Sequence, residues 1–148
     1  MPLNIKQLGA NPLQGRRLSL QPLGPQHADF LVQTYQLDEF MDCYRMAQDR
    51  AVTAEQICQR LEQEKYYTPQ QLRRIEWVVT NKTHKPIGIA SLADYQPSHH
   101  RAELLVGIVQ QQDRHGHAGV EATLLVMEFA FNCAQLHKLT SFVYGSNE

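Results

Sequence analysis

The chain has 148 residues, of which 43% are hydrophobic, and this suits one globular domain with a core of its own. The formal net charge is -1 at pH 7 and no apolar run approaches the roughly 20 residues that cross a bilayer, so we expect neither a nucleic-acid-binding protein nor a membrane protein. The three cysteines are widely spaced and odd in number, which predicts reduced thiols and a cytoplasmic location.

The N-terminal segment predicts a lead-in followed by a short strand. Residues 1–17 hold two prolines and two glycines, so we expect an irregular lead-in to a single domain at residues 18–148. Leu18 and Leu20 alternate with polar residues, which predicts a strand that stops at Pro22.

Helices are predicted next. Pro25 suits a first helical turn. The apolar side of that helix would be formed by Phe30, Leu31 and Tyr35. Residues 38–50 are mixed and fit either a second short helix or an ordered loop. Thr53 and Gln56 form a capping-box pattern, which predicts a helix that runs to residues 66–68, before a proline.

Three strand patterns follow with short links between them. They are "IEWVVTN" at 75–81, "KPIGIASLADY" at 85–95 and "RAELLVGIV" at 101–109. Consecutive strands with short connections predict an antiparallel meander.

The C-terminal part predicts a helix and a last strand. Residues 120–136 are almost wholly apolar, with one narrow polar stripe, so we expect a helix that is covered on most sides. "KLTSFVYG" at 138–145 reads as a strand, and a strand–helix–strand unit predicts a parallel, right-handed crossover. The order of elements is typical of an α/β or α+β sheet domain.

The segment "QQQDRHGHAG" at 110–119 lies between the third strand of the meander and the apolar helix. It is either a plain connection or a cradle for phosphates, because a helix N-terminus with small residues presents free N–H groups to an anion.

Several of these segments together resemble the GNAT acetyltransferases, in particular the branch that acetylates the N-termini of ribosomal proteins. The matching motifs are "AELLVGI" at 102–108, "RHGHAGVEA" at 114–122, "FAF" at 129–131 and "LHKL" at 136–139. They come in the family's order and at its spacings, and the resemblance spans residues 16–148.

The resemblance implies a fold and an activity. The fold is an α/β (α+β) domain, whose mixed sheet has an antiparallel meander, a central helix and a parallel crossover. The activity is transfer of an acetyl group from acetyl-CoA to a primary amine, on a protein N-terminus or a small molecule. Because the family continues beyond the position of Glu148, we expect the C-terminal portion of the fold to be missing and the apolar helix to favour a homodimer.

The resemblance also assigns roles to particular residues. The backbone of Ile108 and Val109 would hold the thioester arm of acetyl-CoA, and the phosphates would bind at the start of the central helix. The residues expected in this cofactor site are Arg114, His115, Gly116, His117, Ala118, Gly119 and Asn147. Glu103 is the candidate general base, although strand alternation leaves open whether it faces the reaction or solvent. No metal ion is expected, since the histidines of the two loops have no cysteine at ligand spacing.

The phosphate-binding motif departs from the family's pattern of Gln or Arg, two residues, Gly, one residue, and Gly or Ala. One alignment anchors on Gly116 and Ala118 and puts Asp113 first, where its charge would repel a pyrophosphate. The other anchors on Arg114 and puts His117 where glycine is expected, which limits backbone approach. Both departures leave open a second hypothesis, a GNAT-like binding module or fragment without catalysis.

Overall fold

The structure is a computed structural model that describes residues 10–37, 40, 53–68, 70–110, 112–113 and 117–140. Its strands are β1 (Leu13–Gln14), β2 (Leu18–Pro22), β3 (Ile75–Asn81), β4 (Pro86–Gln96), β5 (Arg101–Ile108) and β6 (Lys138–Thr140). Its helices are α2 (Ala28–Tyr35), α4 (Ala54–Glu64) and α5 (Ala118–Glu128), with the 3-10 turns η1 (Pro25–His27) and η3 (Pro97–His99) and the π-helical turn η5 (Phe129–Cys133).

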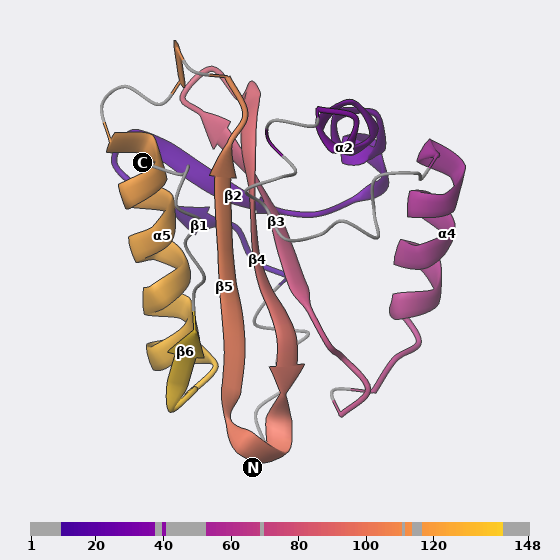
Figure 1. The fold of residues 1–148 in the computed structure, drawn as a ribbon, viewed down its shortest axis with the longest axis vertical. Helices are drawn as coiled ribbons and strands as arrows, with labels where there is room; N and C mark the ends of the chain where they lie inside the picture. The colour runs from indigo at the N-terminus through magenta and orange to yellow at the C-terminus, as the bar shows by residue number, and fades with distance from the viewer. Residues whose placement is uncertain are drawn as a thin grey trace.

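The strands form a mixed sheet in the order β1-β2-β3-β4-β5-β6 (Figure 1). Neighbours are antiparallel from β1 to β5, whereas β6 runs parallel to β5. The predicted antiparallel meander and parallel crossover are therefore confirmed. α5 lies on one face of the sheet, and α2 and α4 lie on the other (Figure 1). The described chain is thus a sheet between two helical layers.

The strand boundaries follow the strand patterns in the sequence. β3 covers the predicted residues 75–81, and β4 and β5 begin within one residue of their predicted starts. The segment expected to be an irregular lead-in contains β1, whose Leu13 pairs with Leu20 of β2. A strand of two residues is too short for alternation to show in the sequence. The strand predicted at 138–145 is described only to Thr140.

The N-terminus of α4 has the predicted capping box. The Thr53 hydroxyl accepts a hydrogen bond from the Gln56 N–H at 3.2 Å, and Gln56 Oε1 accepts one from the Thr53 N–H at 2.9 Å. α4 ends at Glu64, a little before the predicted residues 66–68, because the backbone then tightens into bonds three residues apart.

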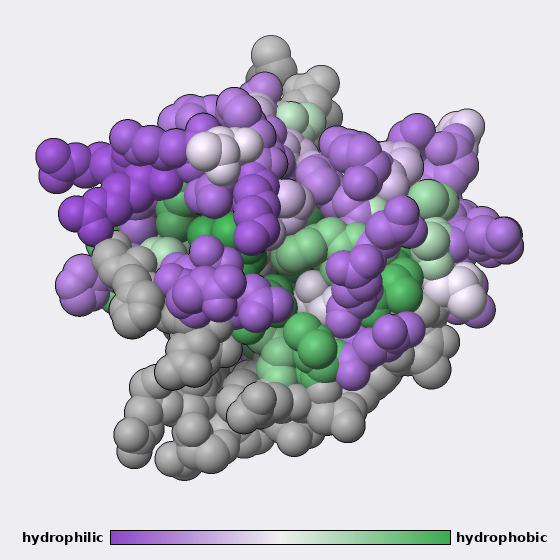
Figure 2. Space-filling view, turned by 90° about the horizontal axis from the view of Figure 1, so that it is seen from above, coloured by the Kyte–Doolittle hydropathy of each residue, from purple (hydrophilic) through white to green (hydrophobic). Residues whose placement is uncertain are grey.

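Two hydrophobic clusters lie on opposite faces of the sheet. In the larger one, under α5, Trp77 and Phe129 meet edge to face with ring centroids 5.1 Å apart, so Trp77 is a core residue. The smaller one lies under α2 and α4 and includes Phe40, the one described residue of segment 38–50. In the view from above, hydrophobic side chains are visible between hydrophilic ones on both the left and the right side of the molecule (Figure 2).

α5 begins at Ala118, two residues before the predicted start, and continues into η5. There the Ala134 N–H donates to the Phe129 carbonyl, five residues earlier, at 2.8 Å. The prediction that most sides of this helix are covered is wrong at two adjacent turns, because Val120 and Leu124 are 56% and 58% exposed. An apolar composition cannot indicate how many sides of a helix are packed. Within the described residues, no helix combines the length and hydrophobicity that crossing a bilayer requires.

Four charged side chains join α4 to β3. Arg60 of α4 donates to Glu76 of β3 at 2.6 Å and to Glu64 at 3.4 Å, and Arg74 Nε lies 3.0 Å from Glu76 Oε1. The side chains of Arg60 and Glu76 are only 22% and 12% exposed. Burial raises the pKa of the Glu64 carboxyl, and the nearby Arg60 charge opposes that shift. Glu76 is therefore the carboxylate that both arginines share.

We expect Glu76→Gln to lower the free energy of unfolding by about 1–3 kcal/mol, because Arg60 and Arg74 would keep partly buried charges without their shared carboxylate. Glu64→Gln should change it by less than about 1 kcal/mol, because burial already disfavours the Glu64 charge. Urea unfolding followed by circular dichroism measures both differences.

The matched control is Glu62→Gln, in a pair with Lys65 whose side chains are 59% and 63% exposed. Removing this exposed pair should cost less than about 0.5 kcal/mol. Equal losses in the Glu62 and Glu76 variants would show that the α4–β3 network adds nothing beyond a surface pair.

Candidate active site

The connection from β5 into α5 brings the middle of the sheet next to a helix N-terminus. β5 ends at Ile108, and the Val109 N–H donates to the Ile87 carbonyl of β4 at 2.9 Å. Residues 117–119 form the N-cap and the first two positions of α5. The other residues predicted for the cofactor lie outside the described part of the chain: Arg114, His115, Gly116 and Asn147.

His117 leaves the first turn of α5 without a side-chain cap. Its backbone is left-handed, with φ 62° and ψ 35°, and its side chain makes no capping hydrogen bond. A usual N-cap residue is extended and its side chain accepts an N–H of the first turn. The first N–H groups of a helix have no partner within the helix, and they lie at the positive end of its dipole. This end of α5 is therefore suited to bind an anion.

Gly119 leaves room beside that helix end. Among the described residues, the single heavy atom within 4 Å of a Cβ built on Gly119 is Ile108 Cγ1, at 4.0 Å. Packing within the described chain therefore does not require glycine at this position. The space that a side chain would fill lies where the last residue of β5 meets the first turn of α5, the kind of helix end at which anions bind.

The backbone conformation at His117 distinguishes between the two alignments of the phosphate motif. A left-handed φ is the conformation that glycine adopts freely and other residues seldom adopt. The alignment that puts His117 at the family's glycine position therefore agrees with the backbone. In the described part of the chain, Asp113 Oδ2 is buried without a hydrogen-bond partner. That oxygen lies within the connection from β5 to α5.

Glu103 lies on the side of β5 that faces α2 and α4. Its neighbours Ala102 and Leu104 belong to the cluster under α5, whereas Leu105 belongs to the cluster under α2 and α4. Because side chains alternate along a strand, half-buried Glu103 shares the face of Leu105. From Ile108 it is five residues along β5, about 17 Å at the usual rise of a strand. A cofactor held by its phosphates at α5 therefore reaches Glu103 only through an extended arm.

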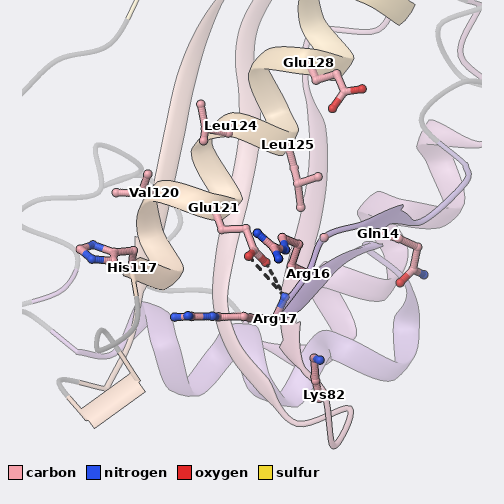
Figure 3. A pocket seen from close by; sticks show the side chains of 11 residues that line it. Gln14, Arg16, Arg17, Lys82, His117, Val120, Glu121, Leu124, Leu125 and Glu128 are labelled. Atoms are coloured by element: carbon pink, nitrogen blue, oxygen red, sulfur yellow. Dashed lines mark hydrogen bonds between the residues drawn. The ribbon is translucent and has the colours of Figure 1, made fainter.

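A cavity of about 880 Å³ runs along α5, and we call it the α5 groove (Figure 3). One wall is α5 itself, from His117 to Glu128. The other wall is the β1–β2 turn, with Arg16 and Arg17, and the β3–β4 turn, with Lys82. Three cationic side chains thus gather near the N-terminal end of the helix.

Glu121 attaches the β1–β2 turn to α5. Its carboxylate accepts the Arg17 N–H at 3.0 and 3.3 Å and the Leu18 N–H at 2.9 Å. Gly15 makes this approach feasible, because a Cβ there would lie 2.6 Å from Glu121 Oε2. The grouping of Arg16, Arg17 and Lys82 could not be predicted from the sequence, because these residues lie in two separate turns. Only the docking of those turns beside α5 brings them together.

The described part of the chain has no group of three or more His, Cys, Asp or Glu side chains placed to hold a metal ion.

The sequence matches a known family of domains. The family model described as acetyltransferase (GNAT) domain matches residues 17–148. Comparison with curated protein sequences finds no significant match.

Three solved structures illustrate the structural likeness. Spermidine N-acetyltransferase from Vibrio cholerae, in complex with CoA and spermine, has a TM-score of 0.73 and 16% identity over 86% of this chain and 71% of that one. A Vibrio cholerae protein assigned as a ribosomal-protein-serine acetyltransferase has a TM-score of 0.66 and 22% identity over 93% of this chain and 76% of that one. RimJ from Mycobacterium smegmatis, in complex with CoA-disulfide, has a TM-score of 0.70 and 14% identity over 93% of this chain and 69% of that one.

At these identities the likeness shows a shared fold, whereas the family model covers all but the first 16 residues. The chain therefore belongs to the GNAT acetyltransferase domain family.

Proposed function

We propose that this protein is an N-acetyltransferase that moves an acetyl group from acetyl-CoA to a primary amine, in the cytoplasm. The observation that carries the proposal is the uncapped N-terminus of α5, placed at the end of β5 with an open space at Gly119. Relatives of the same fold, one bound to CoA and spermine and another bound to CoA-disulfide, support the choice of cofactor.

The proposed cofactor site extends from α5 back along β5. The N–H groups of Ala118 and Gly119 would bind phosphate oxygens, helped by the helix dipole. Backbone groups of Ile108 and Val109 would hold the arm that leads to the thioester. The predicted contributions of Arg114, His115, Gly116 and Asn147 remain part of this proposal.

In the proposed reaction, acetyl-CoA supplies the thioester whose carbonyl carbon the amine nitrogen attacks. The new C–N bond forms, the C–S bond breaks, the thiolate leaves, and the proton lost by the amine passes to the Glu103 carboxylate. A lysine-like amine near pKa 10.4 needs about 4–5 kcal/mol for deprotonation at pH 7. A protein α-amine near pKa 8 needs only about 1 kcal/mol, so the demand on Glu103 is smaller for that acceptor.

The acceptor would approach from the side of α2 and α4, because Glu103 shares the sheet face that these helices cover. Acceptors of both classes occur among structures of this fold, as polyamine and as ribosomal protein. We propose a primary amine, on a protein N-terminus or on a small molecule.

A second candidate function is a GNAT-like binding module without catalysis. Two observations favour it. His117 puts a side chain where the phosphate motif has glycine, and Asp113 brings a buried carboxylate oxygen close to the same connection. Both oppose tight binding of a pyrophosphate.

The first experiment measures melting with acetyl-CoA and turnover with two acceptors, spermine and a peptide with a free N-terminal serine. A ligand at about 100 times its dissociation constant stabilises by roughly 2.7 kcal/mol, which raises the melting temperature by several degrees in a domain of this size. Glu103→Gln should lower kcat by about 10²–10⁴-fold and keep the melting shift, because a base acts on the amine and not on the cofactor.

Asp94→Asn is the matched control, because Asp94 is an exposed carboxylate at the β4–β5 bulge and asparagine accepts its left-handed φ of 48°. It should keep full activity. A melting shift without turnover of either amine would favour the binding module. No shift in a folded sample would overturn the cofactor site itself.

We expect His117→Gly to stabilise the fold by roughly 0.5–1 kcal/mol and to tighten acetyl-CoA binding. The left-handed backbone costs a non-glycine residue about 1–2 kcal/mol, and the extra freedom of glycine in the unfolded state offsets part of the gain. His84→Gly is the matched control, since His84 is also exposed and left-handed, with φ 64°. Both variants should melt higher, while calorimetric titration should show tighter binding only for His117→Gly. Weaker binding in that variant would mean that the imidazole itself contacts the cofactor.

A further inference from the structure

The α5 groove has an apolar ridge along its helical wall. Val120 and Leu124 lie one turn apart on α5 and expose more than half of their surface. Ala122 and Val126, on another side of the same helix, are fully buried against the sheet. α5 therefore has two apolar sides, and within the described residues only one of them is fully packed. Adjacent exposed apolar side chains that line a groove indicate an interaction surface.

The charges of the α5 groove are separated along the helix. Arg16, Arg17 and Lys82 lie toward the N-terminal end of α5, and Glu128 lies at the opposite end (Figure 3). Glu121, between them, accepts backbone N–H groups of the β1–β2 turn, so its charge is engaged within the chain. The groove thus presents cations at one end, an apolar middle and an exposed carboxylate at the other end.

We propose that a second copy of this chain occupies the α5 groove, with the two α5 helices antiparallel about a two-fold axis near Leu124. In such a contact each residue meets the same surface on both copies. Four residues of a helix span about 6 Å, so Glu128 of one copy reaches the level of Val120 in the other, at the cationic end of the groove. Each end of the interface then pairs a carboxylate with cations, and the centre buries both Leu124 side chains.

Self-complementarity favours a second copy over other occupants. A small anion would satisfy the cations but would leave Val120 and Leu124 in water. An uncharged apolar ligand would cover those two side chains but would bring no carboxylate to the cationic end of the groove. A second α5 supplies both the apolar ridge and the carboxylate, at the spacing that the groove requires. This association is independent of the proposed acetyl transfer.

The strength of the contact follows from its size. One helix pair with two flanking turns lies at the small end of specific interfaces, which are commonly weak and transient. We therefore expect a dissociation constant in the micromolar range and a mass that depends on concentration.

Sedimentation velocity of the whole chain at about 1–200 μM tests the proposal. The mass should rise from 17.0 kDa toward twice that value as the concentration increases. Leu124→Lys should keep the protein monomeric throughout, because it puts two like charges at the two-fold axis. Since Leu124 is more than half exposed, its variant should melt within a few degrees of the parent, which separates lost association from lost folding.

Charge reversal tests the antiparallel register. Glu128→Lys and Arg16→Glu should each weaken the dimer about tenfold, and the double variant should return to within a few-fold of the parent. Glu55→Lys, the same change at an exposed position in the first turn of α4, should leave association unchanged.

Three results would overturn the inference. They are a parent chain of 17.0 kDa at every concentration, a dimer that tolerates Leu124→Lys, and a double charge reversal as weak as the two single changes combined. A monomeric parent that still turns over acetyl-CoA would refute the dimer alone, whereas a dimer without turnover would refute only the proposed activity.

Discussion

The packing of α5 against the sheet determines where the candidate functional groups lie. Ala122, Val126 and Phe129 are buried on the strands, and Trp77 meets Phe129 edge to face. This contact holds the helix along β5, so that its first turn reaches the end of the strand. The uncapped N–H groups and the backbone of β5 are thereby held on one rigid support, which a cofactor bound by its phosphates and its arm requires.

The other end of the same unit is fixed by the return of the chain to β6. The His137 N–H donates to the His100 carbonyl at 2.7 Å, and the two imidazole rings stack with centroids 4.7 Å apart. These contacts place the start of β6 beside Arg101, where the parallel pairing begins. The crossover is therefore anchored at both ends of α5, by side-chain packing along the helix and by backbone bonds at its exit.

Glu121 has two opposing electrostatic effects at the first turns of α5. A carboxylate there interacts favourably with the positive end of the helix dipole but repels a bound phosphate. Its oxygens accept N–H groups of Arg17 and Leu18, so much of its charge is balanced by the β1–β2 turn. The same contact brings Arg16 and Arg17 to the α5 groove. The Glu121 carboxylate thus holds the cationic β1–β2 turn beside α5, and it leaves the N-terminus of the helix available to a ligand.

The sequence predicts those parts of the fold whose cause is local. The strand pattern at residues 75–81 predicts β3 within its observed bounds, and the Thr53–Gln56 pair predicts the start of α4. Parts whose cause is tertiary could not be predicted. β1 exists because Leu13 pairs with Leu20, and the α5 groove exists because two distant turns dock beside α5. Within the candidate site, the anion-binding helix end could be predicted from small residues before an apolar helix, but the left-handed backbone at His117 could not.

Strand alternation in the sequence leaves open which sheet face carries Glu103, because the sequence does not show which helices cover each face. The structure resolves it through the partners of β5, and the two sheet faces differ in chemistry. The face under α5 is apolar, while the face of Glu103 also carries polar groups such as Ser19 and Thr80, whose hydroxyls are 2.9 Å apart.

An ionised carboxylate costs less free energy where partial exposure keeps some of its hydration, as at the half-buried Glu103. A base placed under α5 would instead lose its charge to desolvation. The division of the sheet into an apolar face that holds α5 and a face that also carries polar groups is therefore compatible with the proposed role of Glu103 as a base.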